Sequence, residues 1–116
     1  MPKHERLSSK KNIAALFKKG KAYTHYPIRL ICLPMEGLEH HQVLFTVPRR
    51  HFKKAVDRNL LKRRIREAYR QHKHIIPYKS SEEVHFLLGY VYIAREKCTY
   101  PSIETKIVAS LYRLKK

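Results

Sequence analysis

A dense run of basic side chains is the strongest chemical feature of the 116-residue sequence. The 25 residues from Arg49 to Lys73 contain 11 Lys or Arg and only two acidic residues, Asp57 and Glu67. Guanidinium and ammonium groups bind phosphate, and arginine does so through planar, two-pronged hydrogen bonds. The run therefore indicates phosphate binding, whereas the scattered acidic residues offer no carboxylate pair for acid-base catalysis.

The basic residues fall on one side of a helix if residues 57–75 are helical. At 100° per residue, an arc of about 140° holds six cations and one amide, and no acid. Like charges one turn apart destabilise a helix, so a face that is only solvated usually mixes signs. The arc favours polyanion binding, with a purely solvated face as the alternative. Its members are Arg58, Asn59, Lys62, Arg63, Arg66, Arg70 and Lys73.

One residue of this arc, Asn59, has more than one interpretation. The Asn59 amide could hydrogen-bond a sugar, a base edge or backbone, or it could cap a turn near the helix start. Opposite the arc lie Leu61, Ile65, Ala68 and His72, which we expect to face a core.

Composition supports a folded domain that binds a polyanion. The formal charge is +17, with 26 Lys or Arg against 9 acidic residues, while 43% of the residues are hydrophobic. Nucleic acid is the leading partner for such a charge, and an anionic membrane is second. No apolar run approaches the roughly 20 residues of a membrane span, and residues 1–6 lack the apolar stretch of a signal peptide. We expect a cytoplasmic protein whose two cysteines, Cys32 and Cys98, are free thiols.

The pattern predicts three helices and at least three strands in one small α+β sandwich. The helices are expected at 9–19, 57–75 and from about 99 onward, and the strands at 28–33, 42–47 and 84–94. A single domain should span 1–116, with 1–7 as a flexible tail. Gly20 is expected as a left-handed C-terminal residue, Ser8 or Ser9 and Asp57 as N-caps, and Thr99 or Tyr100 as the cap of the last helix.

The sequence also predicts how the strands pair and where they end. The strands 28–33 and 42–47 look like a hairpin with a loose loop. Pro34 should end the first of them, and Gly89 is a possible bulge. Pro77 should stop the second helix before a polar loop at 79–83.

The stretch from Ala55 to Arg70 resembles the RNR motif of the bacterial ribonuclease P protein subunit, whose pattern is R-N-x-x-K-R-x-x-R. The matching positions are Arg58, Asn59, Lys62, Arg63 and Arg66, and Glu67 and Arg70 fit the usual continuation. The resemblance extends along nearly the whole chain. It implies the order αβββαβα with a left-handed βαβ crossover, a fold shared by domains of ribosomal proteins and translation factors.

The resemblance also implies a function. In this family a large RNA with Mg²⁺ removes the 5′ leader of precursor tRNA, and the protein binds that catalytic RNA and the single-stranded leader. By that likeness, this endoribonuclease subunit carries no catalytic residue, binds no metal or other cofactor by itself, and needs no membrane or protein partner. The motif helix would contact the catalytic RNA through Arg58, Asn59, Lys62, Arg63, Arg66 and Arg70. Additional contacts would come from Arg49, Arg50, Lys53 and Lys54.

A leader-binding cleft is implied between the first helix and the sheet. Its candidate residues are Ile13, Phe17, Arg29 and Ile31, with Tyr23 and Tyr26 as weaker candidates near its entrance. This sequence has fewer aromatics here than the family usually has, which reduces base stacking; Arg29 could substitute by stacking or by a phosphate contact. For Ile13 and Phe17 the alternative is simple core packing.

Two other functions compete with this interpretation. A ribosomal or other structural RNA-binding protein of the same fold is the first, although it does not account for the intact motif. A DNA-binding module is the second, and it is weaker because an almost wholly cationic stripe positions phosphate without reading bases. The eight histidines lack the spacing of a zinc site.

Overall fold

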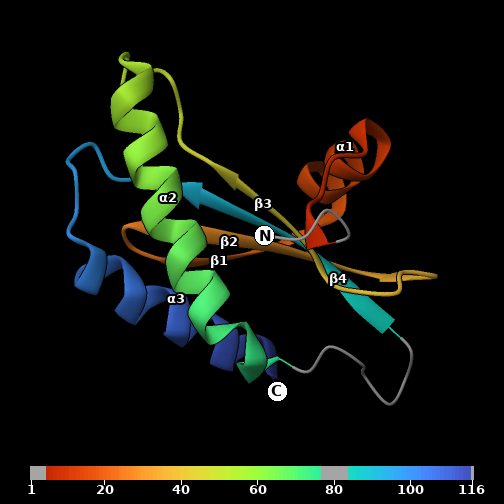
Figure 1. Cartoon of the computed structure of the whole chain (residues 1–116). Helices are drawn as coiled ribbons and strands as arrows, with labels where there is room; N and C mark the ends of the chain where they lie inside the picture. The colour runs from red at the N-terminus through yellow and green to blue at the C-terminus, as the bar shows by residue number, and fades with distance from the viewer. Residues whose placement is uncertain (1–4, 77–83, 116) are drawn as a thin grey trace.

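In the computed structural model, a four-stranded sheet lies between one helix on one face and two on the other (Figure 1). The structure describes residues 5–76 and 84–115. The helices are α1 (Lys10–Lys19), α2 (Ala55–His72) and α3 (Tyr100–Lys115), with a 3-10 turn η2 (Lys73–Ile75) after α2. The strands are β1 (Lys21–His25), β2 (Ile28–Glu36), β3 (Gln42–Thr46) and β4 (Val84–Tyr92). The predicted α+β sandwich and its element order are therefore confirmed.

The strand order in the sheet is β1-β2-β4-β3. β4 pairs antiparallel with β2 and parallel with β3, so the predicted hairpin between residues 28–33 and 42–47 is wrong. β4 lies between those two strands because it is apolar on both faces, and an inner position covers both. The hairpin that does form joins β1 to β2, with Lys21 opposite Cys32. β3 reaches β4 only through the crossover that contains α2.

Strand β2 continues through Pro34, which was expected to end it. The first residue of β1, Lys21, lies opposite Cys32. Beyond Cys32, β2 therefore has β4 on one side and no strand of the described sheet on the other. A proline has no N–H to donate, and a sheet edge tolerates this loss.

Two apolar clusters fill the sandwich, one on each face of the sheet. Ile28 and Leu30 face α2 and α3, while Ile31 and Leu33 pack on the side of α1, as the alternation of β2 predicted. The apolar side of α3 was also predicted correctly, since Ile103, Ile107 and Leu111 are fully buried.

Residues 5–7 belong to the packed structure and not to a flexible tail. Leu7 is 2% exposed in the cluster beneath α1, and its N–H donates to the carbonyl oxygen of Val43 at 3.0 Å. Arg6 forms a parallel bridge with Val43, which extends pairing beyond the edge of β3. Glu5 is buried as well.

Two glycines let α1 pack against the sheet. Gly20 has φ −68° and ψ 152°, so it is extended and not left-handed as predicted. A Cβ there would lie 2.4 Å from the Leu16 carbonyl oxygen and 2.6 Å from Cγ2 of Ile31. Gly89 is paired in regular register and forms no bulge; a Cβ there would meet Cδ2 of Leu16 at 3.0 Å. The close approach of α1 leaves no room for a side chain at Gly20 and little room for one at Gly89.

The helix ends follow the sequence in part. The Ser9 hydroxyl accepts a hydrogen bond from the Asn12 N–H, and the Thr99 hydroxyl accepts one from the Ser102 N–H. The predicted Asp57 cap is wrong, because α2 begins at Ala55 and Asp57 lies inside its first turn. There its carboxylate pairs with Lys97 at 2.8 Å. The predicted helix stop at Pro77 and the loop at 79–83 fall outside the described residues. In the part of the chain that the structure describes, no helix is both long and apolar enough for a membrane span.

We predict that Gly20→Ala lowers the free energy of unfolding by about 1–3 kcal/mol, because the new methyl group forces α1 away from the sheet. Urea denaturation would measure the change. Gly37→Asn is the control: Gly37 has φ 85° and open space around its Cβ position, and asparagine tolerates that backbone region. The two variants losing equal stability would contradict the close-packing account.

Candidate nucleic-acid interface

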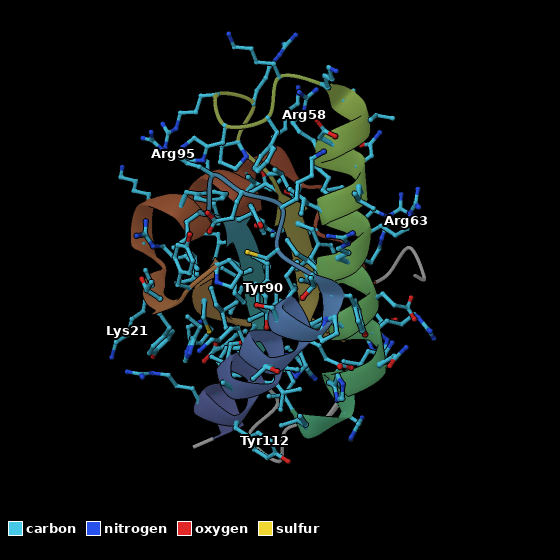
Figure 2. All side chains as sticks on the ribbon, turned by 90° about the vertical axis from the view of Figure 1, so that its left-hand side faces the viewer. Lys21, Arg58, Arg63, Tyr90, Arg95 and Tyr112 are labelled. Carbon is cyan, nitrogen blue, oxygen red and sulfur yellow. The ribbon has the colours of Figure 1, made fainter. Side chains whose placement is uncertain are left out.

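Helix α2 presents its basic side to solvent because its opposite side is buried. Leu61, Ile65 and Ala68 are fully buried and Tyr69 nearly so. Figure 2 shows Arg63 projecting outward from this helix. The predicted division of α2 into a core side and a cationic side is therefore present. We call its cationic side the α2 stripe, which consists of Arg58, Asn59, Lys62, Arg63, Arg66 and Arg70.

Arg58 fastens the segment that leads into α2. Its Nη1 atom donates to the carbonyl oxygens of Phe52 and Lys53, both at 2.8 Å. Phe52 itself is buried against Tyr92, with ring centroids 5.8 Å apart. Part of the hydrogen-bonding capacity of Arg58 is thus used inside the protein, where it holds the start of the helix in place of a side-chain cap.

Arg70 is paired within its own helix. Its guanidinium donates to both carboxylate oxygens of Glu67, and the Gln71 amide donates to the same carboxylate. The hydrogen bonds from Arg70, and then from Gln71, lower the pKa of Glu67 to about 2. Glu67 is therefore ionised at neutral pH, and it partly cancels the charge of Arg70 at the far end of the α2 stripe. Lys73, one residue beyond α2, likewise pairs with Glu5 at 2.8 Å.

The middle of the α2 stripe is available to a ligand. Arg63 and Arg66 are exposed, Lys62 is half-buried, and none of the three has an ion-pair partner among the described residues. Asn59 is also exposed, at the same end of the helix as Arg58. Four i,i+4 neighbours, Arg58, Lys62, Arg66 and Arg70, form one cationic row along this side.

A pocket of about 190 Å³ opens between the α2 stripe and the edge of the sheet. Arg6, Lys62 and Arg66 supply its cations, and β3 supplies its apolar part. The complete lining is Arg6, Val43, Leu44, Phe45, Lys62 and Arg66. Cations beside an aromatic ring can hold a phosphate and stack a base. Sequence reasoning missed Arg6, because only the bridge to Val43 brings it there.

The candidate contacts in the loop before α2 extend the same charged surface. Arg49 and Arg50 are exposed in the turn that follows β3, and Lys53 and Lys54 are exposed immediately before the helix. Since Arg58 binds the carbonyls of 52 and 53, the loop and the helix are held together as one basic unit.

The four candidate residues of the leader cleft lie on α1 and on the α1 face of β2. Ile13 and Ile31 are partly buried against the cluster of Leu7, Leu16 and Leu87. Phe17 is 47% exposed, although the tip of its ring lies near Gly89. Arg29 is exposed on the same face of β2 as Ile31, and its Nε donates to the Thr24 hydroxyl at 3.3 Å. Phe17 and Arg29 therefore have surface free for a ligand, whereas Ile13 and Ile31 also serve packing.

Of the two tyrosines expected near the cleft entrance, one lies on the other side of the sheet. Tyr23 packs with the opposite apolar cluster, because it pairs with Leu30 and shares that face of the sheet. The prediction for Tyr23 is wrong. Tyr26 is 55% exposed and its hydroxyl donates to Glu96 at 2.6 Å.

Several histidines have structural contacts. The Nδ1 atom of His41 accepts a hydrogen bond from the Phe86 N–H at 3.0 Å, and Nε2 of His72 lies 2.9 Å from the Glu104 carboxylate, which joins α2 to α3. Among residues 5–76 and 84–115, no three His, Cys, Asp or Glu side chains are grouped so that they could hold a metal ion.

Comparison with known proteins places this geometry in a family. The family model described as Ribonuclease P matches residues 1–115. The Ribonuclease P protein component of Porphyromonas gingivalis is 31% identical over 119 residues, covering 98% of this chain and 85% of the relative. That of Picosynechococcus sp. is 32% identical over 100 residues, covering 86% and 81%.

Solved structures show the same fold. The RNase P protein from Thermotoga maritima has a TM-score of 0.76 at 24% identity, covering 94% of this chain and 96% of that one. A mutant RNase P protein from Staphylococcus aureus has a TM-score of 0.80 at 20% identity, covering 97% and 90%.

We predict different stability effects for two arginines of the α2 stripe. Arg58→Ala should lower the free energy of unfolding by about 1–3 kcal/mol, because two carbonyl oxygens lose a charged donor. Arg63→Ala, the control at an exposed position, should change it by less than about 0.5 kcal/mol. Urea denaturation of both variants at one salt concentration is the measurement, and a larger loss for Arg63→Ala would contradict this assignment.

Proposed function

The chain belongs to the ribonuclease P protein family, and on that premise we propose that it binds the catalytic RNA of ribonuclease P and the 5′ leader of precursor tRNA in the cytoplasm. Family membership itself supports a role in tRNA processing and association with the RNA subunit. The proposal goes further: the α2 stripe binds the catalytic RNA, and the α1 side of the sheet binds the leader.

The observation that carries the proposal is the unpaired centre of the α2 stripe. Arg63 and Arg66 coincide with motif positions, are exposed, and have no ion-pair partner in the described structure. Two guanidinium groups one turn apart suit neighbouring phosphates of a folded RNA, whose charge removes the repulsion between them. Contacts of this kind position the RNA without reading its sequence.

The metal of the reaction belongs to the RNA in this proposal. Mg²⁺ prefers oxygen ligands, often carboxylates and phosphates. The α2 stripe offers cations and one amide, and its neighbouring carboxylate, Glu67, already accepts hydrogen bonds from Arg70 and Gln71. These residues do not fit a Mg²⁺ site. The protein would instead lower the local repulsion between RNA strands, which lets phosphates approach and hold the ion.

The leader would be bound on the α1 side of the sheet, at Phe17 and Arg29. Phe17 offers an exposed ring on which one base can stack, and Arg29 offers a guanidinium on the same side of the sheet. Base-on-aromatic stacking tolerates any sequence, because every base has a flat face. That property suits a protein that must accept the leaders of many precursor tRNAs.

The direct test mixes the full chain with a bacterial ribonuclease P RNA and a precursor tRNA at low Mg²⁺. We expect the protein to stimulate cleavage at the mature 5′ end, because its cations replace part of the charge screening that Mg²⁺ otherwise supplies. Cleavage is followed on a gel. Tight binding to ribosomal RNA without stimulation would instead favour a structural RNA-binding protein.

We predict that Phe17→Ala weakens binding of precursor tRNA to the reconstituted enzyme about 5- to 100-fold, because one stacked base is lost. Binding of mature tRNA, which has no leader, should be unchanged. Phe17→Tyr is the matched control and should retain leader binding. Equal effects of Phe17→Ala on both substrates would assign Phe17 to packing alone.

A further inference from the structure

A second basic groove lies between β1 and α3, separate from the α2 stripe and from the residues proposed to bind the leader. Its volume is about 520 Å³. Figure 2 shows two of its residues, Lys21 and Tyr112, toward one end of the molecule and Arg58 toward the other. The lining consists of Lys21, Tyr23, His25, Ala109, Tyr112 and Arg113.

The groove follows from two simple periodicities. Lys21, Tyr23 and His25 alternate along β1 and therefore share one face of the sheet. Ala109, Arg113 and the neighbouring Tyr112 lie within one turn of α3, on the side toward β1. The small side chain of Ala109 leaves space between the longer side chains.

Cations surround an aromatic ring in this groove, and its lining contains no acidic residue. The guanidinium carbon of Arg113 lies 4.7 Å from the centre of the Tyr23 ring, and Nζ of Lys21 lies 5.6 Å from it. Contact with the ring face positions both cations at the groove. The lining therefore attracts an anion and offers no charge of its own to neutralise it.

The imidazole of His25 lines the same groove. Burial, and then the charges of Arg113 and Lys106, lower the pKa of its imidazole below the ordinary value. Its Nε2 atom is buried and has no hydrogen-bond partner among the described residues. An anion in the groove would reverse the electrostatic part of that shift and stabilise the protonated ring.

Tyr112 adds an exposed aromatic surface at the same place. It is 53% exposed, so much of its ring is open to contact with a ligand. A cationic groove with an exposed aromatic side chain is the arrangement that binds single-stranded nucleic acid, through phosphate contacts and base stacking.

We propose that this groove is a second RNA-binding site, in which a phosphate of a single strand lies between Lys21 and Arg113 and a base stacks on Tyr112. The choice of RNA as the polyanion rests on the proposed function, which associates the chain with a large RNA. A membrane surface fits less well, because the site is a groove lined by cations and not a flat apolar patch.

The experiment follows the His25 imidazole resonance of the full chain by NMR from pH 5 to 8, with and without a 12-nucleotide oligouridylate. Bound phosphate should raise the His25 pKa by roughly one unit. The double variant Lys21→Gln/Arg113→Gln should show no RNA-induced shift when each protein is compared with its own RNA-free titration. Arg63→Ala, which alters the α2 stripe, should keep the shift at saturating RNA.

Base stacking is tested by the oligouridylate concentration that gives half of the His25 response. Tyr112→Ala should raise it about 5- to 100-fold, and Tyr112→Phe should restore it. The site is overturned if RNA leaves the His25 titration unchanged, or if the shift persists in the double variant. It is also overturned if anionic phosphatidylglycerol vesicles produce the shift and RNA does not. These results do not depend on tRNA cleavage, so they are distinguishable from a failure of the proposed function.

Discussion

Repulsion between cations on α2 is the constraint on which the rest of the structure depends. Arg58, Lys62, Arg66 and Arg70 follow one another at four-residue spacing, which places like charges one turn apart and disfavours the helix. The helix forms because its other side is held in the core: Leu61 and Ile65 are fully buried against the sheet and α3. Burial of each such side chain contributes about 1.5–3 kcal/mol, several times the cost of one like-charge pair.

The few acidic residues are placed around the margins of this charge. Glu67 binds Arg70, Asp57 binds Lys97, and buried Glu5 binds Lys73. Arg58 is satisfied by backbone carbonyls at the start of the helix. The centre of the α2 stripe is left with cations that a polyanion can neutralise. A second group of cations lies at the opposite edge of the sheet, beside β1. There Arg113 and Lys21 share the ring of Tyr23, and the groove lining has no acidic residue to neutralise them.

Local pattern predicted the helices, the two faces of β2 and the basic side of α2, because these depend on the neighbours of each residue along the chain. Long-range pairing was not predictable in the same way. The sequence 21–25 is polar and alternates weakly, so β1 was not identified from its residues, and the position of β4 beside β3 depends on a partner 45 residues away. The sequence suggests a left-handed residue at Gly20 and a bulge at Gly89, whereas in the structure both glycines let Leu16 approach the sheet. Arg6 reaches the pocket beside α2 only through its bridge to Val43.

The most direct test of this account measures stability and RNA binding in one double variant, Arg63→Gln/Arg66→Gln. Both side chains are exposed and have no ion-pair partner in the described structure, so we expect the free energy of unfolding at low salt to be unchanged or up to about 1 kcal/mol higher. The slope of log affinity for ribonuclease P RNA against log salt concentration should fall by about two. A less stable variant with an unchanged salt slope would contradict the account, because the two arginines would then serve the fold and not the RNA.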